Sequence, residues 1–299
     1  MTAPHDAVRR TVGFIGPGIM GAPMIANLVR AGHSVAAVGR SPESRARIAT
    51  AGAREVATPA AAAAGADVVI TMLPDSPDVL DVVLGSGQLA EAMARGTLFI
   101  DMSTIRPAAA VELATALADR EIAALDAPVS GGEAGAIEGT LSIMVGGDAG
   151  AVERARPVLE AMGSTITHVG PAGAGQATKA ANQLVVAANI QALAEAIVLL
   201  EASGVDVESA LTALAGGLAG STVLTRKRAA FLSGDFTPGF RAELHRKDLG
   251  IIMSTAIERN LSLPSAALVA QLMAALVAQG DGGRDHSALL GLARRLNGA

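Results

Sequence analysis

The chain of 299 residues contains no cysteine, tryptophan or tyrosine, and aromatic residues make up only 2% of it. Without cysteine it can form no disulfide and has no thiolate for catalysis or for metal binding. Few aromatic rings are present for nucleic-acid bases to stack on, and the net charge is -5. We therefore expect no nucleic-acid partner.

Long apolar runs without polar side chains are also missing. The most apolar segment, which ends near residue 202, is interrupted by Asn189, Gln191 and Glu195. Such a segment is typical of a helix buried in protein, so we expect no membrane partner. The first ten residues hold no apolar signal-peptide core, which predicts a cytoplasmic location. Hydrophobic residues make up 51% and charged residues 17%, as in a globular chain long enough for two domains.

A glycine-rich turn lies near the N-terminus. Residues 11–15 form a short apolar run with β-branched side chains, followed by the turn Gly16-Pro17-Gly18-Ile19-Met20-Gly21, a helical pattern over 22–31 and a second strand over 34–38. In this context Gly-x-Gly-x-x-Gly predicts a dinucleotide site. Gly16 permits the tight turn, Gly18 lets a pyrophosphate approach and Gly21 lets the helix pack, while the amides at the helix start bind the phosphates. A glycine turn without a ligand is the alternative.

The end of the second strand indicates which dinucleotide is bound. NAD sites usually place a carboxylate there, but this chain has Gly39-Arg40-Ser41 and no acid before Glu43. Arg40 can pair with a 2′-phosphate and Ser41 can add a hydrogen bond, which favours NADP. NAD stays possible, because Arg40 can instead stack on the adenine.

The alternation of strands and helices continues. Strands are predicted over 67–72 and 97–101, and the turns behind them, which contain Leu73, Pro74 and Thr104, are predicted to line the cofactor. Further strands over 122–125, 141–145 and 165–169 give a sheet of about eight strands. The sequence thus predicts a Rossmann-type α/β domain over residues 1–170 and an all-α domain over 171–299, built on a long interdomain helix.

That helix, predicted over 176–202, carries a polar cluster. Lys179 is followed by Asn182 and Gln183, three and four residues later, so the three share one face. A surface lysine near a helix end is the alternative. The length of the apolar helix also predicts a homodimer or a homotetramer with these helices near the interface.

A second glycine cluster follows a predicted strand. In Asp126-Ala127-Pro128-Val129-Ser130-Gly131-Gly132, two adjacent glycines after a serine expose consecutive amides beside a hydroxyl. Such a segment is suited to a carboxylate. An ordinary tight turn is the alternative.

Four segments carry a family resemblance: the Gly16 turn, the Asp126 cluster, Gly173-x-Gly175-x-x-x-Lys179 and Lys247-Asp248-Leu249. Over nearly the whole chain, their order and spacing resemble the β-hydroxyacid dehydrogenase family, which includes 3-hydroxyisobutyrate dehydrogenase. The resemblance implies that Lys179 is catalytic and that Ser130, Gly131 and Gly132 hold the substrate carboxylate. It further implies that Phe240 and Asp248 complete the pocket and that Lys247 and Thr104 contact the cofactor. Many relatives have asparagine four residues after the lysine, so whether Asn182 or Gln183 touches the substrate stays open.

Within the family, residues 216–224, 238–240 and 285–289 are most similar to the members that reduce tartronate semialdehyde. The resemblance implies NADPH-dependent reduction of this small 3-oxo acid to D-glycerate, with Lys179 protonating the carbonyl oxygen. A 3-hydroxyisobutyrate, succinic semialdehyde or glyoxylate enzyme of the same family is the alternative. Imine reductases are more distant and generally lack this lysine. A non-catalytic dinucleotide-binding regulator is a remote alternative.

Two other groups of residues are interpreted as structural. Asp285, His286 and Ser287 are the residue types of a catalytic triad, but neighbours in sequence do not form one, and we expect a segment that closes the pocket. The other histidines have no metal-ligand spacing, so each is predicted to be structural or exposed and no metal is expected; they are His5, His33, His168 and His245.

Overall fold

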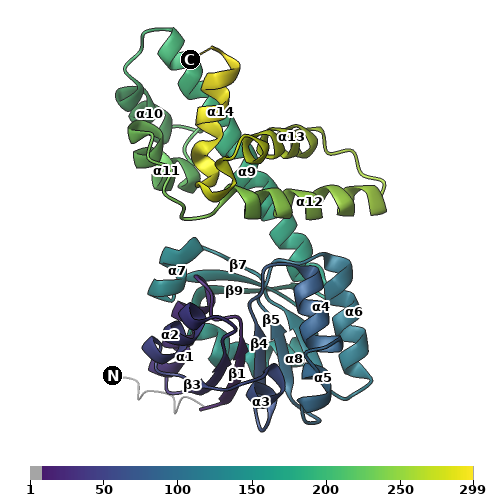
Figure 1. Ribbon diagram of the computed structural model, residues 1–299. Coiled ribbons are helices and arrows are strands. Elements are labelled where there is room, and N and C mark those ends of the chain that lie inside the picture. The colour runs from purple at the N-terminus through teal and green to yellow at the C-terminus, as the bar shows by residue number, and fades with distance from the viewer. Residues whose placement is uncertain (1–8, 299) are drawn as a thin grey trace, which may run out of the picture. The chain divides into compact units, whose positions relative to one another are not determined.

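A computed structural model of the protein describes residues 9–298 (Figure 1). His5 and most of the N-terminal segment on which the expected location rests lie outside the described residues. The chain divides into two compact units between Lys179 and Ala180. The domain boundary near residue 170 stays a prediction.

Within the described residues, the first unit is built on a sheet of nine strands. Six of them are parallel neighbours in the order β3-β2-β1-β4-β5-β6, which is the Rossmann order. Because the strand order reverses between β1 and β4, the carboxyl ends of these two strands flank a ligand crevice in folds of this type. The six strands are β1 (Thr11–Ile15), β2 (Ser34–Val38), β3 (Arg54–Glu55), β4 (Val68–Thr71), β5 (Leu98–Asp101) and β6 (Ala123–Asp126).

Three more strands extend the sheet beyond β6: β7 (Val129–Ser130), β8 (Leu141–Gly146) and β9 (Gly163–Gly170). Strand β8 runs antiparallel to β6 and β7 and parallel to β9. The predicted strands are all present within a residue or two of their expected ends. The two additional ones, β3 and β7, have only two residues each, too few to produce an alternating pattern.

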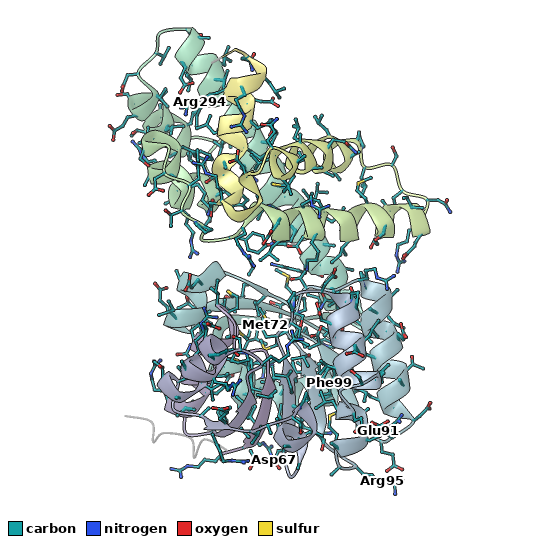
Figure 2. The ribbon with its side chains drawn as sticks, viewed as in Figure 1. Asp67, Met72, Glu91, Arg95, Phe99 and Arg294 are labelled. Atoms are coloured by element: carbon teal, nitrogen blue, oxygen red, sulfur yellow. The ribbon has the colours of Figure 1, made fainter. Side chains whose placement is uncertain are left out.

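Helices cover both faces of this sheet. Successive side chains of a strand point to opposite faces, so each face has its own buried cluster of apolar side chains. In β5, Leu98 and Ile100 belong to one buried cluster. Phe99 between them, which is labelled in Figure 2, belongs to another. The first cluster packs under α1 (Gly21–Arg30), α2 (Pro42–Thr50), α7 (Gly132–Glu138) and α8 (Ala149–Glu160). The second packs under α3 (Pro59–Ala63), α4 (Ser76–Leu84), α5 (Leu89–Ala92) and α6 (Pro107–Ala118).

The second unit is helical, as predicted. Helix α9 (Ala174–Ala202) begins in the first unit and supplies Ile190 and Ile197 to the core of the second, together with Phe231 and Met273 from later helices. The other helices are α10 (Val207–Ala215), α11 (Thr222–Ser233), α12 (Ala242–Glu258), α13 (Pro264–Ala278) and α14 (Leu289–Leu296).

Helix α9 is long and apolar enough to cross a membrane by length and composition alone, with a mean hydropathy of 1.8 over its most apolar 18 residues. A core helix of a globular protein meets the same two criteria. Its polar side chains are engaged within the protein: Gln191 Nε2 donates to Glu195 Oε1 at 2.7 Å. Length and apolarity therefore do not assign α9 to a membrane.

Candidate active site

The carboxyl ends of the parallel strands meet at one edge of the sheet in the first unit. Met72, directly after β4, marks this edge, and Asp67, directly before β4, marks the opposite one (Figure 2). The turns behind β1, β2, β4, β5 and β6 therefore come together, and these turns contain most of the predicted cofactor residues.

The three glycines of the first turn occupy three different environments. Gly16 has φ +105°, and a Cβ there would lie 2.2 Å from the Met72 carbonyl oxygen. A Cβ on Gly21 would lie 2.0 Å from the Gly16 carbonyl oxygen, whereas one on Gly18 would meet nothing within 4 Å. The turn thus combines a strained bend, close helix packing and an open approach to the backbone, as a dinucleotide requires.

Arg40 and Ser41 follow β2, as predicted, and Arg40 is exposed. Ser41 caps α2: its Oγ accepts from Ser44 N at 3.2 Å, and Ser44 Oγ accepts from Ser41 N at 2.9 Å. The Glu43 backbone N–H and the Ser41 hydroxyl lower the pKa of the Glu43 carboxyl. Ser41 therefore has a structural role at the start of α2, and its contact with a 2′-phosphate stays a prediction.

The turns behind β4 and β5 are joined to each other. Leu73 N donates to the hydroxyl of the buried Ser103 at 2.9 Å, and Arg106 N donates to Ser76 Oγ at 3.0 Å. These bonds hold the two predicted cofactor segments, Leu73-Pro74 and the turn around Thr104, side by side.

The second glycine cluster has an unusual backbone. Ser130 ends β7, and the two glycines that follow have φ +141° at Gly131 and φ +66° at Gly132. A Cβ on Gly131 would lie 3.1 Å from Leu141 Cδ2, while one on Gly132 would meet nothing within 4 Å. The backbone is therefore approachable at Gly132, which suits a small anion.

Lys179 is brought to this cluster by the first turns of α9. Its side chain is buried, with 7% relative exposure, and its Nζ donates to the Val129 carbonyl oxygen at 2.7 Å. The alternative of a surface lysine is therefore wrong. The ammonium group is bonded to the residue directly before the Ser130 to Gly132 segment.

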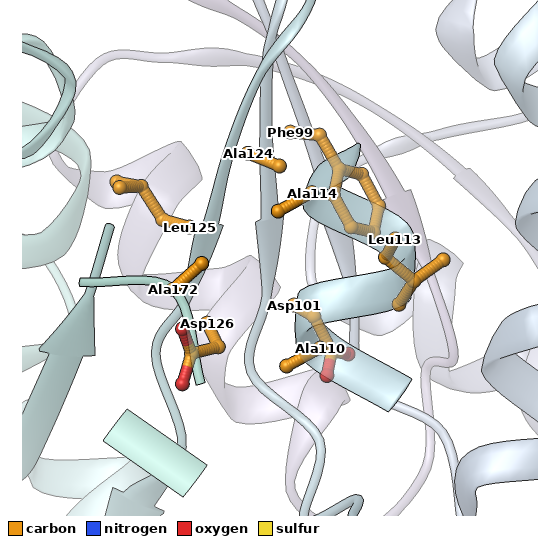
Figure 3. Close-up of a pocket in the computed structure, with 9 residues that line it drawn as sticks. All are labelled: Phe99, Asp101, Ala110, Leu113, Ala114, Ala124, Leu125, Asp126 and Ala172. Carbon is orange, nitrogen blue, oxygen red and sulfur yellow. The ribbon is translucent and has the colours of Figure 1, made fainter. Parts of the chain in front are cut away.

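A pair of buried carboxylates at this edge was not predicted as a site. Asp101 and Asp126 are register partners at the ends of β5 and β6, and Figure 3 shows both at the same end of a small cavity. Burial raises the pKa of Asp101 to about 6, against hydrogen bonds from Ser103 and Thr71. Burial also raises the pKa of Asp126. The sequence signal was an aspartate at the end of each of two neighbouring strands.

The polar residues predicted in the helical unit form one hydrogen-bonded chain. Asn182 Nδ2 donates to Gln183 Oε1 at 2.9 Å, and Gln183 Nε2 donates to Asp248 Oδ2 at 2.5 Å. Asp248 is buried and pairs through Oδ1 with Lys247 Nζ at 2.9 Å. The two amides thus act as a unit, and which of them touches a substrate stays a prediction.

Phe240 packs against two histidines that sequence reasoning did not connect. Its ring centroid lies 5.6 Å from that of His245 and 5.4 Å from that of His286. His245 Nε2 lies 3.2 Å from the Gln183 carbonyl oxygen. The backbone of Gln183 and the ring of Phe240 are therefore held by one aromatic cluster.

Asp285, His286 and Ser287 do not form a catalytic triad. Ser287 Oγ donates to Asp285 Oδ1 at 2.6 Å, and the Asp285 carboxylate also pairs with Lys227 Nζ at 2.8 Å and accepts from the Phe240 N–H at 3.0 Å. Asp285 thus fixes the loop that carries Phe240. Within residues 9–298, no three histidine, aspartate or glutamate side chains gather as a metal site would require.

Two family models match the chain. Residues 11–170 match the NAD binding domain of 6-phosphogluconate dehydrogenase. Residues 173–293 match a second one, described as NAD-binding of NADP-dependent 3-hydroxyisobutyrate dehydrogenase.

Similar proteins agree with these matches. The 2-hydroxy-3-oxopropionate reductase of Escherichia coli strain K12 is 40% identical over 93% of this chain and 95% of its own length. The 3-hydroxyisobutyrate dehydrogenase of Mycobacterium tuberculosis, solved with L-serine, has a TM-score of 0.87 and 38% identity over 96% of this chain and 99% of its own. A structure described as Psf3 in complex with NADP+ and 2-OPP has a TM-score of 0.85 and 26% identity over 94% of this chain and 99% of its own. Together with the glycine turn and the lysine helix, these similarities show that the chain belongs to the β-hydroxyacid dehydrogenase family and is an NAD(P)-dependent oxidoreductase.

Proposed function

We propose that the protein reduces tartronate semialdehyde (2-hydroxy-3-oxopropionate) to D-glycerate with NADPH, and that Lys179 donates the proton. The observation that carries this proposal is the buried Lys179 ammonium, bonded to Val129 at 2.7 Å and therefore adjacent to Ser130 and the two glycines behind it. A cation beside an anion-binding backbone suits a short aldehyde that bears a carboxylate. The similarity to the Escherichia coli reductase supports this substrate.

The residues at the first turn fit a dinucleotide. The space at Gly18 leaves room for a pyrophosphate, and the backbone at Gly16 and Gly21 could not accommodate a side chain. When bound, NADPH supplies the hydride that reduces the carbonyl carbon. We assign its 2′-phosphate to Arg40 and Ser41, because an exposed guanidinium at the end of β2 can form two parallel hydrogen bonds to phosphate. The other proposed cofactor residues are Pro17, Ile19, Met20, Leu73, Pro74, Thr104 and Lys247.

Lys179 acts on the carbonyl oxygen of the substrate. As negative charge develops on this oxygen, the ammonium group stabilises it and transfers a proton to it, giving the alcohol. Ser130, Gly131 and Gly132 bind the substrate carboxylate. Each hydrogen bond to this charged group contributes roughly 1.5–3 kcal/mol, which orients a molecule with few other contacts. Asn182, Gln183, Phe240 and Asp248 are proposed as further substrate contacts.

The test is a set of initial rates of NADPH and NADH oxidation with tartronate semialdehyde, succinic semialdehyde, glyoxylate and methylmalonate semialdehyde. The proposal predicts the highest kcat/KM for tartronate semialdehyde with NADPH. A higher value for another aldehyde would assign the enzyme to another branch of the family. A preference for NADH would contradict only the proposed role of Arg40 and would leave the proposed substrate unaffected.

The alternative substrate is 3-hydroxyisobutyrate, and the similarity to the Mycobacterium tuberculosis enzyme favours it. Oxidation of 3-hydroxyisobutyrate with a kcat/KM above that for D-glycerate would establish this alternative. If the protein binds NADPH but reduces none of the aldehydes, a non-catalytic regulator becomes the better interpretation.

We also propose that the protein is a cytoplasmic homodimer or homotetramer. Several large apolar side chains of the helical unit are exposed, among them Val185 at 58% and Leu199 at 68% on α9 and Ile257 at 74% on α12. Exposed apolar side chains of this size favour burial against another copy of the chain. Light scattering coupled to size-exclusion chromatography distinguishes a monomer from either oligomer.

A further inference from the structure

Gln176 is a buried residue that the proposed mechanism leaves unused. Its side chain is 1% exposed, and both of its polar atoms are bonded. Oε1 accepts from Ile105 N at 3.1 Å, and Nε2 donates to the Ser103 carbonyl oxygen at 2.8 Å and to Asp101 Oδ2 at 3.5 Å. All three partners belong to the end of β5 and the turn behind it. Gln176 therefore holds the same turn that contains Thr104.

The backbone of Gln176 is held from a different strand. Asp126 Oδ2 accepts from Gln176 N at 2.7 Å, and Asp126 Oδ1 accepts from Gly173 N at 2.8 Å. A carboxylate at a helix start satisfies amides that have no partner within the helix and complements its positive end. The contact is tight, because a Cβ on Gly175 would lie 2.6 Å from the Asp126 carbonyl oxygen.

These two attachments hold the first turn of α9, and Lys179 lies one turn further along the helix. Lys179 comes three residues after Gln176, on the same face of α9. Val129, whose carbonyl oxygen accepts from Lys179 Nζ, comes three residues after Asp126. The segment that starts at Asp126 thus holds α9 twice, at its first turn and at the lysine. The side chain of Gln176 adds a third attachment, to the turn behind β5.

We propose that Gln176 is the positioning residue that keeps Lys179 in register with the turn behind β5, with Asp126 as its backbone anchor. This inference rests on the proposed function of Lys179 as proton donor. An error of about 1 Å in the position of a catalytic group can lower a rate by about 100-fold. A glutamine is suited to the task because one end must accept from Ile105 and the other must donate to Ser103.

The first test is Gln176→Leu, which keeps the volume and removes the hydrogen bonds. The expected result is a 10- to 100-fold fall in kcat, with KM for the aldehyde and Kd for NADPH within about threefold of wild type. Gln191→Leu is the matched control, because Gln191 is also buried on α9 but its amide bonds to Glu195 on the same helix. Its kcat is expected within about twofold of wild type. A Gln176→Leu enzyme with kcat within about threefold of wild type would overturn the inference.

Gln176→Glu has nearly the same shape as wild type and is expected to recover activity when its new carboxyl group is protonated. When ionised, the carboxylate introduced by this substitution would face the Ser103 carbonyl oxygen and Asp101, with Asp126 bonded to the backbone of the same residue and Lys179 one helical turn further along α9. Once protonated, the new carboxyl group can accept from Ile105 and donate to Ser103, as the glutamine does. The ratio of the variant's kcat to that of wild type is therefore expected to rise at least about tenfold from pH 8 to pH 5.5. A ratio that does not change with pH contradicts the inference.

A third readout does not depend on activity. The chain has three lysines, Lys179, Lys227 and Lys247, so the rate of reductive methylation can be followed at each by peptide mass spectrometry. Gln176→Leu is expected to raise the rate at Lys179 several-fold relative to Lys227, and Gln191→Leu is not. If wild type reduces no aldehyde, the proposed function fails, yet this measurement still decides whether Gln176 fixes Lys179. An unchanged rate at Lys179 in Gln176→Leu overturns the positioning role.

Discussion

His245 and His286 face each other through their Nδ1 atoms at 2.9 Å in the helical unit. His245 Nε2 lies against the Gln183 carbonyl oxygen, which can only accept, so this nitrogen carries a proton, and in the neutral ring His245 Nδ1 is then an acceptor. To a neutral His245, His286 donates from Nδ1. Its Nε2 is a buried acceptor with no hydrogen-bond partner among the described residues. One proton between the two Nδ1 atoms therefore satisfies this contact, and a second buried charge is not needed for it.

This pair predicts a loss of stability in acid. Burial lowers the pKa of His286 well below 6.5, the neighbouring His245 and Lys227 act in the same direction, and Asp285 opposes them. Below pH 6.5 the unfolded chain binds a proton that the folded chain excludes, so this contribution is complete above pH 6.5 and is lost as pH falls. The free energy of unfolding should fall by up to about 1.4 kcal/mol per pH unit from this residue. Urea unfolding of wild type and of His286→Phe at pH 7.5, 6.5 and 5.5 measures this fall. If the free energy of unfolding depends on pH equally in the two proteins, the prediction is contradicted.

The raised pKa of Asp101 predicts the opposite dependence of stability on pH. Because burial raises its pKa from 3.8 to about 6, the folded state binds more protons than the unfolded state between these values. Its contribution is therefore complete below pH 3.8 and is lost as pH rises through 6. Asp101→Asn keeps the acceptor for Thr71 and cannot ionise. The stability of this variant relative to wild type is expected to increase by up to about 3 kcal/mol between pH 4 and pH 7. A difference that is constant across this range would show that Asp101 has an ordinary pKa in the folded protein.

The first half of the sheet could be predicted because each element has its own local signal. The run 11–15, the glycine turn and the helix behind it are neighbours in sequence, and their order alone specifies a dinucleotide site. At Ser41 two local signals overlap. Its place after β2 predicted a phosphate contact, but Pro42 behind it is equally a helix start signal, and the structure uses Ser41 as the cap of α2.

The polar network around Lys179 could not be predicted from the sequence. The reason differs from that for Ser41. Gln176 bonds to residues 71 to 75 positions away in the sequence, and Asp126 bonds to amides 47 and 50 positions away. These contacts depend on the register of β5 with β6 and on the place where α9 begins. Periodicity within one segment carries no information about either.

Lys179→Ala is expected to lower kcat by about 100- to 10,000-fold, the usual contribution of a general acid that also stabilises charge. NADPH binding is expected to stay near wild type, because the proposed cofactor contacts do not include this side chain. Lys179→Arg keeps the charge but has a planar head group that cannot reproduce the geometry of an ammonium, so it is also expected to be slow. Steady-state rates and NADPH fluorescence titration measure the two effects. Turnover of the alanine variant within about tenfold of wild type would refute the assigned role.

Arg40→Ala is expected to raise KM for NADPH about 10- to 100-fold and to leave KM for NADH nearly unchanged, because only NADPH carries the 2′-phosphate. Arg47→Ala is the control, since Arg47 is an exposed arginine of α2 near the end of that helix. It is expected to change neither value. Equal losses for both cofactors in Arg40→Ala would instead indicate stacking of Arg40 on the adenine.

Two alanine substitutions in the glycine turn are expected to separate binding from folding. A Cβ on Gly18 enters open space, so Gly18→Ala is expected to keep the Tm within a few degrees and to weaken NADPH binding at least about tenfold, because the methyl group occupies the path of the pyrophosphate. A Cβ on Gly21 would lie 2.0 Å from a backbone oxygen that cannot move without displacing the turn. Gly21→Ala is therefore expected to lower the free energy of unfolding by about 1–3 kcal/mol.

Differential scanning fluorimetry with and without NADPH measures both effects in one experiment. Gly18→Ala should melt like wild type without NADPH and lose the shift that NADPH produces, because the shift depends on affinity for the folded state. Gly21→Ala should melt earlier without NADPH. If Gly18→Ala keeps the full NADPH shift, the pyrophosphate does not pass over Gly18, and the turn is only a structural bend between β1 and α1.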